Sequence, residues 1–81
     1  MMKVFLSGSI KSVAGGREAL ELEAKTIHQL LQALEREVPA LASQIEQGVA
    51  VSIDGQIFRD DWFQKIPLGA EIFILPKLAG G

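Results

Sequence analysis

The sequence predicts a two-layer α+β domain in which one main helix packs on a mixed sheet of four to five short strands. Several short segments alternate apolar and polar residues, one longer segment repeats apolar residues at intervals of three and four, and turn residues separate these segments. A chain of 81 residues has room for one small domain. We assign residues 1–75 to this domain and residues 76–81 to a flexible C-terminal tail.

The first two strands are predicted on either side of a long connection. Residues 2–8 alternate, so that Val4 and Leu6 share one face of a strand while Phe5 points to the other. Residues 9–17 contain two consecutive glycines and are expected to form a hairpin connection. In residues 19–24, two leucines face inward and two glutamates face water, which is the pattern of a second half-buried strand.

The main helix is predicted to start at Thr26. Thr26 and Gln29 have the spacing of a capping box, in which the threonine oxygen accepts a backbone N–H of the first turn. The apolar residues that follow form one stripe, which is expected to cover the sheet: Ile27, Leu30, Leu31, Leu34 and Val38. Pro39 ends this helix and can open a second short helix that stops at Gly48.

A third strand and a tight turn follow the helices. Residues 49–53 alternate with three branched apolar residues on one face. Asp54-Gly55 is a strong signal for a two-residue turn, because both positions tolerate positive φ. We therefore expect a short return strand over residues 56–58.

The last part of the sheet is a strand that begins at Glu71. Residues 59–69 are expected to form the loop before it, which holds the only tryptophan of the chain. Pro76 is expected to end the strand, because proline cannot donate a hydrogen bond to a sheet ladder. If this strand lies beside residues 2–8, Ile72 and Ile74 point inward.

The composition argues against several classes of function. The formal charge of −2 is spread without a basic run, so we expect no nucleic-acid and no membrane partner. The chain has no cysteine and one histidine, which leaves few options for nucleophilic catalysis. We interpret His28 as a helical surface residue and Asp60-Asp61 as a solvated loop or helix start, so we predict neither an enzyme nor a metal site. A cytoplasmic protein that binds other proteins is the expectation.

Three apolar side chains are predicted to lie on the outer face of the sheet. If the first and last strands are neighbours, Phe5, Phe73 and Leu75 form a contiguous patch there, and such patches usually mark a protein contact. A different strand register, or coverage by residues 60–67, would instead bury one or more of them.

The C-terminal tail, Pro76-Lys77-Leu78-Ala79-Gly80-Gly81, is the second candidate for a partner contact. An extended segment of this length reaches roughly 20 Å and ends in a carboxylate next to two residues without side chains. It is therefore long enough to enter the active site of another protein. The alternative is a frayed terminus without a function.

In these features the chain resembles the ubiquitin-related sulfur carriers, the family that includes the small subunit of molybdopterin synthase (MoaD) and the thiamine-pathway carrier (ThiS). The similar segments are Val51-Ser-Ile-Asp-Gly-Gln56, Pro67-Leu-Gly-Ala-Glu-Ile72 and Ile74-Leu-Pro-Lys-Leu-Ala-Gly-Gly81. The resemblance implies a β-grasp, or ubiquitin-like, roll.

The same resemblance implies a role for the C-terminal carboxylate. Gly81 would be joined to AMP by a separate, ubiquitin-activating-like enzyme, which supplies ATP and Mg²⁺, so that this chain itself binds no cofactor. Sulfur from a donor would then displace AMP and leave a thiocarboxylate on Gly81. Gly80 would let the end enter a narrow site. Phe5, Phe73, Leu75 and the tail residues Pro76, Lys77, Leu78 and Ala79 would contact the partners.

The resemblance leaves the pathway open. The final segment is most similar to the molybdopterin carrier, for which a large catalytic subunit would be a further partner. The segment Phe58-Arg-Asp-Asp-Trp62 instead resembles thiamine carriers, and the end also resembles carriers used in cysteine synthesis. Two other hypotheses remain: a protein modifier that is linked through Gly81 to lysine, and an interaction module with an inert tail.

Overall fold

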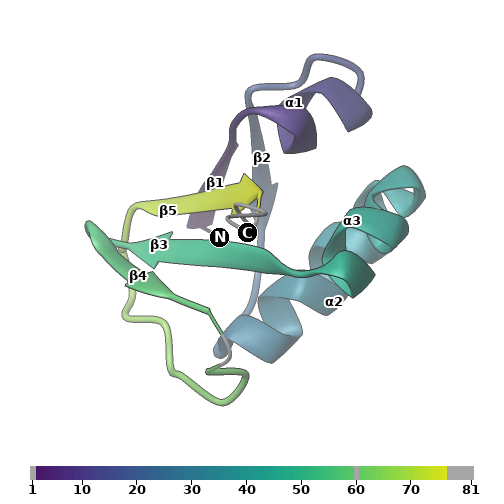
Figure 1. Ribbon diagram of the computed structural model, residues 1–81. Helices are drawn as coiled ribbons and strands as arrows, with labels where there is room; N and C mark the ends of the chain where they lie inside the picture. The colour runs from purple at the N-terminus through teal and green to yellow at the C-terminus, as the bar shows by residue number, and fades with distance from the viewer. Residues whose placement is uncertain (1, 60, 77–81) are drawn as a thin grey trace.

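The computed structural model describes residues 2–59 and 61–76. In this part of the chain, five strands form one sheet in the spatial order β2-β1-β5-β3-β4 (Figure 1). β1 and β5 run parallel, and the other neighbouring pairs run antiparallel. The strands are β1 (Met2–Leu6), β2 (Ala19–Leu22), β3 (Val49–Ile53), β4 (Gln56–Phe58) and β5 (Ile72–Pro76). The predicted α+β class with a mixed sheet is confirmed.

One face of the sheet carries the main helix, α2 (Ile27–Glu37), followed by the 3-10 turn η1 (Pro39–Leu41) and the short helix α3 (Ala42–Gln47) (Figure 1). The predicted cap is present, because the Thr26 hydroxyl accepts the Gln29 N–H at 3.2 Å. The Gln29 side chain accepts in return from the backbone N–H of Lys25 at 2.9 Å, one residue before the position that a capping box uses.

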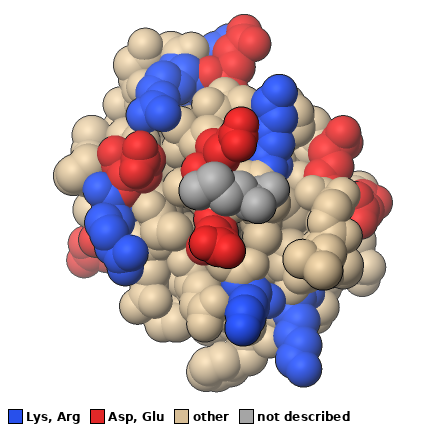
Figure 2. All heavy atoms as spheres, turned by 180° about the vertical axis from the view of Figure 1, so that it is seen from behind, with Lys and Arg blue, Asp and Glu red and all other residues tan. Residues whose placement is uncertain are grey.

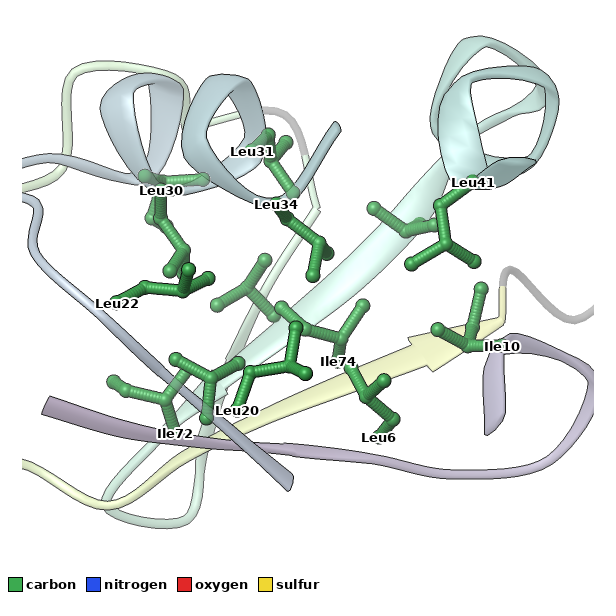
Figure 3. Packing of buried hydrophobic residues seen from close by; sticks show 14 of the residues in the cluster. Leu6, Ile10, Leu20, Leu22, Leu30, Leu31, Leu34, Leu41, Ile72 and Ile74 are labelled. Atoms are coloured by element: carbon green, nitrogen blue, oxygen red, sulfur yellow. The ribbon is translucent and has the colours of Figure 1, made fainter. Parts of the chain in front are cut away.

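The core lies between these helices and the inner face of the sheet. Leu30, Leu31 and Leu34 point from α2 toward the strands, and Leu41 continues this layer from η1 (Figure 3). Ile72 and Ile74 of β5 are fully buried in the middle, as predicted. The strand residues predicted to point inward are also buried: Val4, Leu6, Leu20, Leu22, Val49, Val51 and Ile53.

The structure corrects the prediction for residues 9–17. The sequence predicts a hairpin connection here, but the segment begins with a short helix, α1 (Ser9–Val13). Ile10 is 1% exposed and points toward Leu41, so the helix closes one end of the core (Figure 3). A single turn of five residues is too short to show helical periodicity, and burial of Ile10 rather than local propensity explains it.

The Asp54-Gly55 turn has the predicted positive φ values of 50° and 90°. It also holds the start of β5. The Asp54 N–H donates to the Glu71 carbonyl at 2.9 Å, and the Glu71 N–H donates to the Asp54 carboxylate at 2.8 Å. The tip of one hairpin therefore fixes the position at which the last strand begins.

The loop before β5 is attached to the beginning of α2. The N–H of His28 donates to the Trp62 carbonyl at 2.8 Å, and the N–H of Ile27 donates to the Gln64 carbonyl at 3.0 Å. The first N–H groups of a helix have no partner within the helix. The loop supplies acceptors for two of them, and these bonds fix the position of Trp62.

Candidate functional site

The candidate site is built around the end of β5, the central strand. Pro76 is the last residue of this strand and pairs with Val49 of β3. The sequence predicts that the chain leaves the sheet at Pro76, so the strand is one residue longer than predicted. On its other side Pro76 lies against Gly8, where a Cβ atom would be 3.2 Å from the proline ring. Gly8 also has a φ of 60°, which L side chains rarely adopt. The point from which residues 77–81 start is therefore held from two sides.

An aromatic pair lies beside this point on the outer face of the sheet. Phe5 of β1 and Phe73 of β5 are paired in the parallel register, and their rings stack with centroids 5.0 Å apart and planes at 23°. The Lys3 ammonium lies 5.5 Å from the centre of the Phe5 ring, within the range of a cation–π contact. Both rings are half-buried, so they combine one fixed geometry with an accessible surface.

The strand register extends this surface across the sheet. Phe73 pairs with Ser52 of β3, which pairs in turn with Ile57 of β4, and Ile57 is 53% exposed. Leu75 is half-buried and pairs with Ala50 in the next row. We call Phe5, Phe73 and Leu75 the outer patch. Its predicted position on the face opposite the core is confirmed.

A groove of about 450 Å³ adjoins the outer patch. Leu75 and Pro76 form one wall, and Ile57, Arg59 and Trp62 form the opposite wall. The C-terminal end of α3 and the start of β3 close the remainder, with Glu46 as the acidic residue of the lining. The groove is therefore mainly apolar with one cation and one anion at its margin.

The predicted site residues fall into two groups. Phe5, Phe73 and Leu75 lie on the outer face, and Pro76 ends the same strand directly after Leu75. Lys77, Leu78, Ala79, Gly80 and Gly81 lie outside the described residues, as does Asp60.

Two residues interpreted as structural are exposed. His28 lies in the first turn of α2 and Asp61 in the loop. Within residues 2–59 and 61–76, no group of three His, Asp or Glu side chains is placed to hold a metal ion.

Sequence reasoning missed the far wall of the groove. The sequence patterns place Ile57, Arg59 and Trp62 in a return strand and a loop and indicate no role for them in a site. The one signal in the sequence is the segment Phe58-Arg-Asp-Asp-Trp62, which resembles a segment of thiamine carriers. Its link to Leu75 depends on the β4-β3-β5 strand order, which no local pattern in the sequence encodes.

Charge and hydropathy add two observations. On the face shown in Figure 2, acidic and basic side chains are intermixed and neither sign dominates. None of the helices in the described ranges is long and apolar enough to span a membrane.

The sequence and the fold of this chain were compared with those of known proteins. The sequence profile of the ThiS family matches residues 4–81. No protein among the curated sequences is a significant match.

Several solved structures are similar over almost the whole chain. SAMP1 from Haloferax volcanii is 25% identical with a TM-score of 0.73, covering 99% of this chain and 98% of its own. A chain of the BexX/CysO complex of Amycolatopsis orientalis is 17% identical with a TM-score of 0.76, and both chains are covered completely. A putative molybdopterin converting factor, subunit 1, from Pyrococcus furiosus is 15% identical with a TM-score of 0.70, covering 93% of this chain and 94% of its own. The ubiquitin-like β-grasp fold is thereby confirmed.

Proposed function

Since the chain belongs to the ThiS family of ubiquitin-related sulfur carriers, we propose that it carries sulfur as a thiocarboxylate on Gly81. The observation that supports this proposal is the position at which β5 ends. β5 is the central strand, it ends at Pro76 beside the outer patch, and Lys77 to Gly81 follow it. A partner bound to the patch would receive the segment at a defined position.

The chemistry requires activation of the carboxylate, because a carboxylate oxygen is a poor leaving group. In the first step, an oxygen of the Gly81 carboxylate attacks the α-phosphorus of ATP, and pyrophosphate leaves. In the second step, a hydrosulfide equivalent from a sulfur donor attacks the carbonyl carbon, the bond to the AMP oxygen breaks, and AMP leaves. The product is a thiocarboxylate. An activating enzyme would supply ATP, Mg²⁺ and the positive charge that phosphoryl chemistry needs.

The chain's own contribution would be binding and presentation. Phe5, Phe73 and Leu75 offer an apolar surface of fixed shape, which suits the centre of a protein interface. Gly80 and Gly81 have no side chains, so the end can enter a narrow active site and align with the reacting phosphorus. In this proposal the chain is a carrier and its partners perform catalysis.

For the pathway we propose molybdenum cofactor biosynthesis, with this chain as the small subunit of molybdopterin synthase. The support is the final segment, Ile74-Leu-Pro-Lys-Leu-Ala-Gly-Gly81, which resembles that subunit most. A large subunit would then accept the C-terminal segment and take the sulfur. Carriers for thiamine or cysteine biosynthesis are the alternatives within the same chemistry.

A protein modifier is the second candidate function. It is favoured by the similarity to SAMP1 of Haloferax volcanii, a small archaeal modifier protein, which has the same β-grasp fold. The activated Gly81 carbonyl would then be attacked by a lysine amine of a target, which forms an amide and releases the activating group. Both candidates share the activation step and differ in the nucleophile.

The test is reconstitution with the activating enzyme of the source organism, ATP, Mg²⁺ and sulfide, followed by intact-mass and C-terminal fragment spectra. We expect a mass gain that corresponds to one sulfur replacing one oxygen, located on Gly81. A chain that lacks Gly80 and Gly81 should fold equally and gain nothing. If the complete chain stays unmodified, sulfur transfer is excluded under these conditions. Recovery of Gly81 linked to lysine in digests would select the modifier instead.

A further inference from the structure

The groove between the end of β5 and the wall formed by Ile57, Arg59 and Trp62 is not used by the sulfur chemistry. Its lining includes two exposed large apolar side chains, since Trp62 is 40% and Ile57 is 53% exposed. We propose that this groove is a docking site for the chain's own C-terminal residues, with Leu78 against its apolar walls and the Gly81 carboxylate near Arg59.

The first argument is reach. Pro76 lines the groove, so Lys77 begins at its wall. The opposite wall belongs to β4 and the loop after it, two strand spacings from β5, or about 10 Å at the usual spacing between neighbouring strands. The five residues from Lys77 to Gly81 span up to about 16 Å when extended. The segment is therefore long enough to cross β3 and bring the terminal carboxylate to Arg59.

The second argument is chemical complementarity. The segment carries one large apolar residue, one lysine and a terminal carboxylate. The groove offers Ile57 and Trp62 for the leucine, Glu46 for the lysine and Arg59 for the carboxylate. A guanidinium pairs with a carboxylate through two parallel hydrogen bonds, which gives such a contact its directionality.

The third argument selects this segment over a separate peptide. The segment is attached at the groove itself, so its effective concentration there is set by a tether of a few residues and lies in the millimolar range or above. Neither a second copy nor a free peptide has this advantage at ordinary protein concentrations.

Docking would couple the groove to partner binding. Leu75 belongs both to the outer patch and to the groove wall, so a partner on the patch meets the docked segment. Such a partner would shift the population toward the undocked state by binding that state more tightly. This inference does not depend on sulfur, and it can fail while the carrier function holds.

The test uses the full chain and its single tryptophan. Because Trp62 lines the groove, quenching of its fluorescence by acrylamide reports whether the groove is filled. Leu78→Ser should raise the quenching constant by roughly twofold if docked and undocked states are about equally populated in the parent chain. The matched control is Leu68→Ser, which makes the same change at a fully exposed leucine outside the groove and should leave the constant unchanged.

Arg59→Gln tests the charge contact, with Arg17→Gln as its control at an exposed arginine outside the groove. Arg59→Gln should also raise the quenching constant. The double variant Arg59→Gln/Leu78→Ser should have a quenching constant only slightly above that of Leu78→Ser, because either change alone already releases the same docked segment. Equal quenching constants for the parent chain and Leu78→Ser would overturn the proposal. Protection of Trp62 that grows with protein concentration would also overturn it, since it would assign the contact to a second copy.

Discussion

Phe5 and Phe73 face each other across the parallel β1–β5 pair with stacked rings. The two residues are far apart in sequence, and their contact forms only when the first and last strands pair. The central part of the outer patch is therefore a product of the complete fold. A partner that recognises the stack recognises a folded chain.

We predict that Phe73→Ser weakens activation without unfolding the domain. Loss of one ring removes the stack, and such a pair contributes roughly 0.5–1.5 kcal/mol beyond the buried area. If the ring anchors the activating enzyme, binding should weaken by about tenfold, as for other aromatic anchors at interfaces. The measurement is ATP–pyrophosphate exchange as a function of carrier concentration.

The control for this variant is Phe63→Ser, the same change at a phenylalanine that is 84% exposed in the loop before β5. It should leave the exchange reaction unaltered. If both variants were activated as well as the parent chain, the outer patch would have no role in binding the activating enzyme.

The second prediction compares the same substitution, isoleucine to alanine, on the inner and on the outer face of the sheet. Ile74→Ala removes a fully buried side chain of β5 and should lower the free energy of unfolding by about 2–5 kcal/mol. Ile57→Ala, on the exposed outer face of β4, should change it by roughly 0.5 kcal/mol or less. Urea unfolding followed by circular dichroism measures both. Similar losses for the two variants would contradict the burial described for β4 and β5.

The success of the strand predictions follows from this contrast between faces. Alternation in residues 2–8 and 71–75 was enough to place Ile72 and Ile74 inside and Phe73 and Leu75 outside, because side chains on a strand repeat every two residues. Helix α1 could not be predicted in the same way. Its single buried residue, Ile10, is explained by its position below Leu41, which belongs to a distant part of the chain.

A third prediction concerns the turn that holds β5. Asp54→Ala removes the acceptor of the Glu71 N–H and places alanine at a φ of 50°, so we expect a loss of about 1–3 kcal/mol in the free energy of unfolding. Asp54→Asn keeps an acceptor oxygen and a residue that tolerates positive φ, and should cost clearly less. Thermal unfolding of the two variants compares them directly. Equal losses would mean that the bond to Glu71 contributes nothing.

The fourth prediction concerns the start of the main helix. Thr26→Ala removes the oxygen that accepts the Gln29 N–H and should cost about 1 kcal/mol of folding stability. Thr26→Ser retains the hydroxyl and serves as the control. Chemical denaturation should place the serine variant near the parent chain. A serine variant as unstable as the alanine variant would show that the threonine methyl, and not the cap, is responsible.

The candidate site is only partly predictable because some of its residues follow a local alternation pattern and others are placed by contacts between distant parts of the chain. Local alternation predicts that Phe5, Phe73 and Leu75 share the outer face if the first and last strands pair, as they do. Arg59 directly follows β4, and Trp62 lies in a loop with no periodicity that is held by backbone bonds to the start of α2. Those bonds are made by backbone groups, which carry no sequence signature.

The central position of β5 also determines how the chain resists mechanical load. A partner that pulls on the C-terminal segment pulls along a strand bonded to β1 on one side and to β3 on the other. Such a pull is a shearing force that strains many ladder bonds together, whereas an edge strand would be peeled away one bond at a time. Since forced unfolding is governed by the unfolding rate, the domain should withstand traction from this end far better than traction applied at β4. A protein that drew on the segment could thus exert force without unfolding the domain to which it is attached.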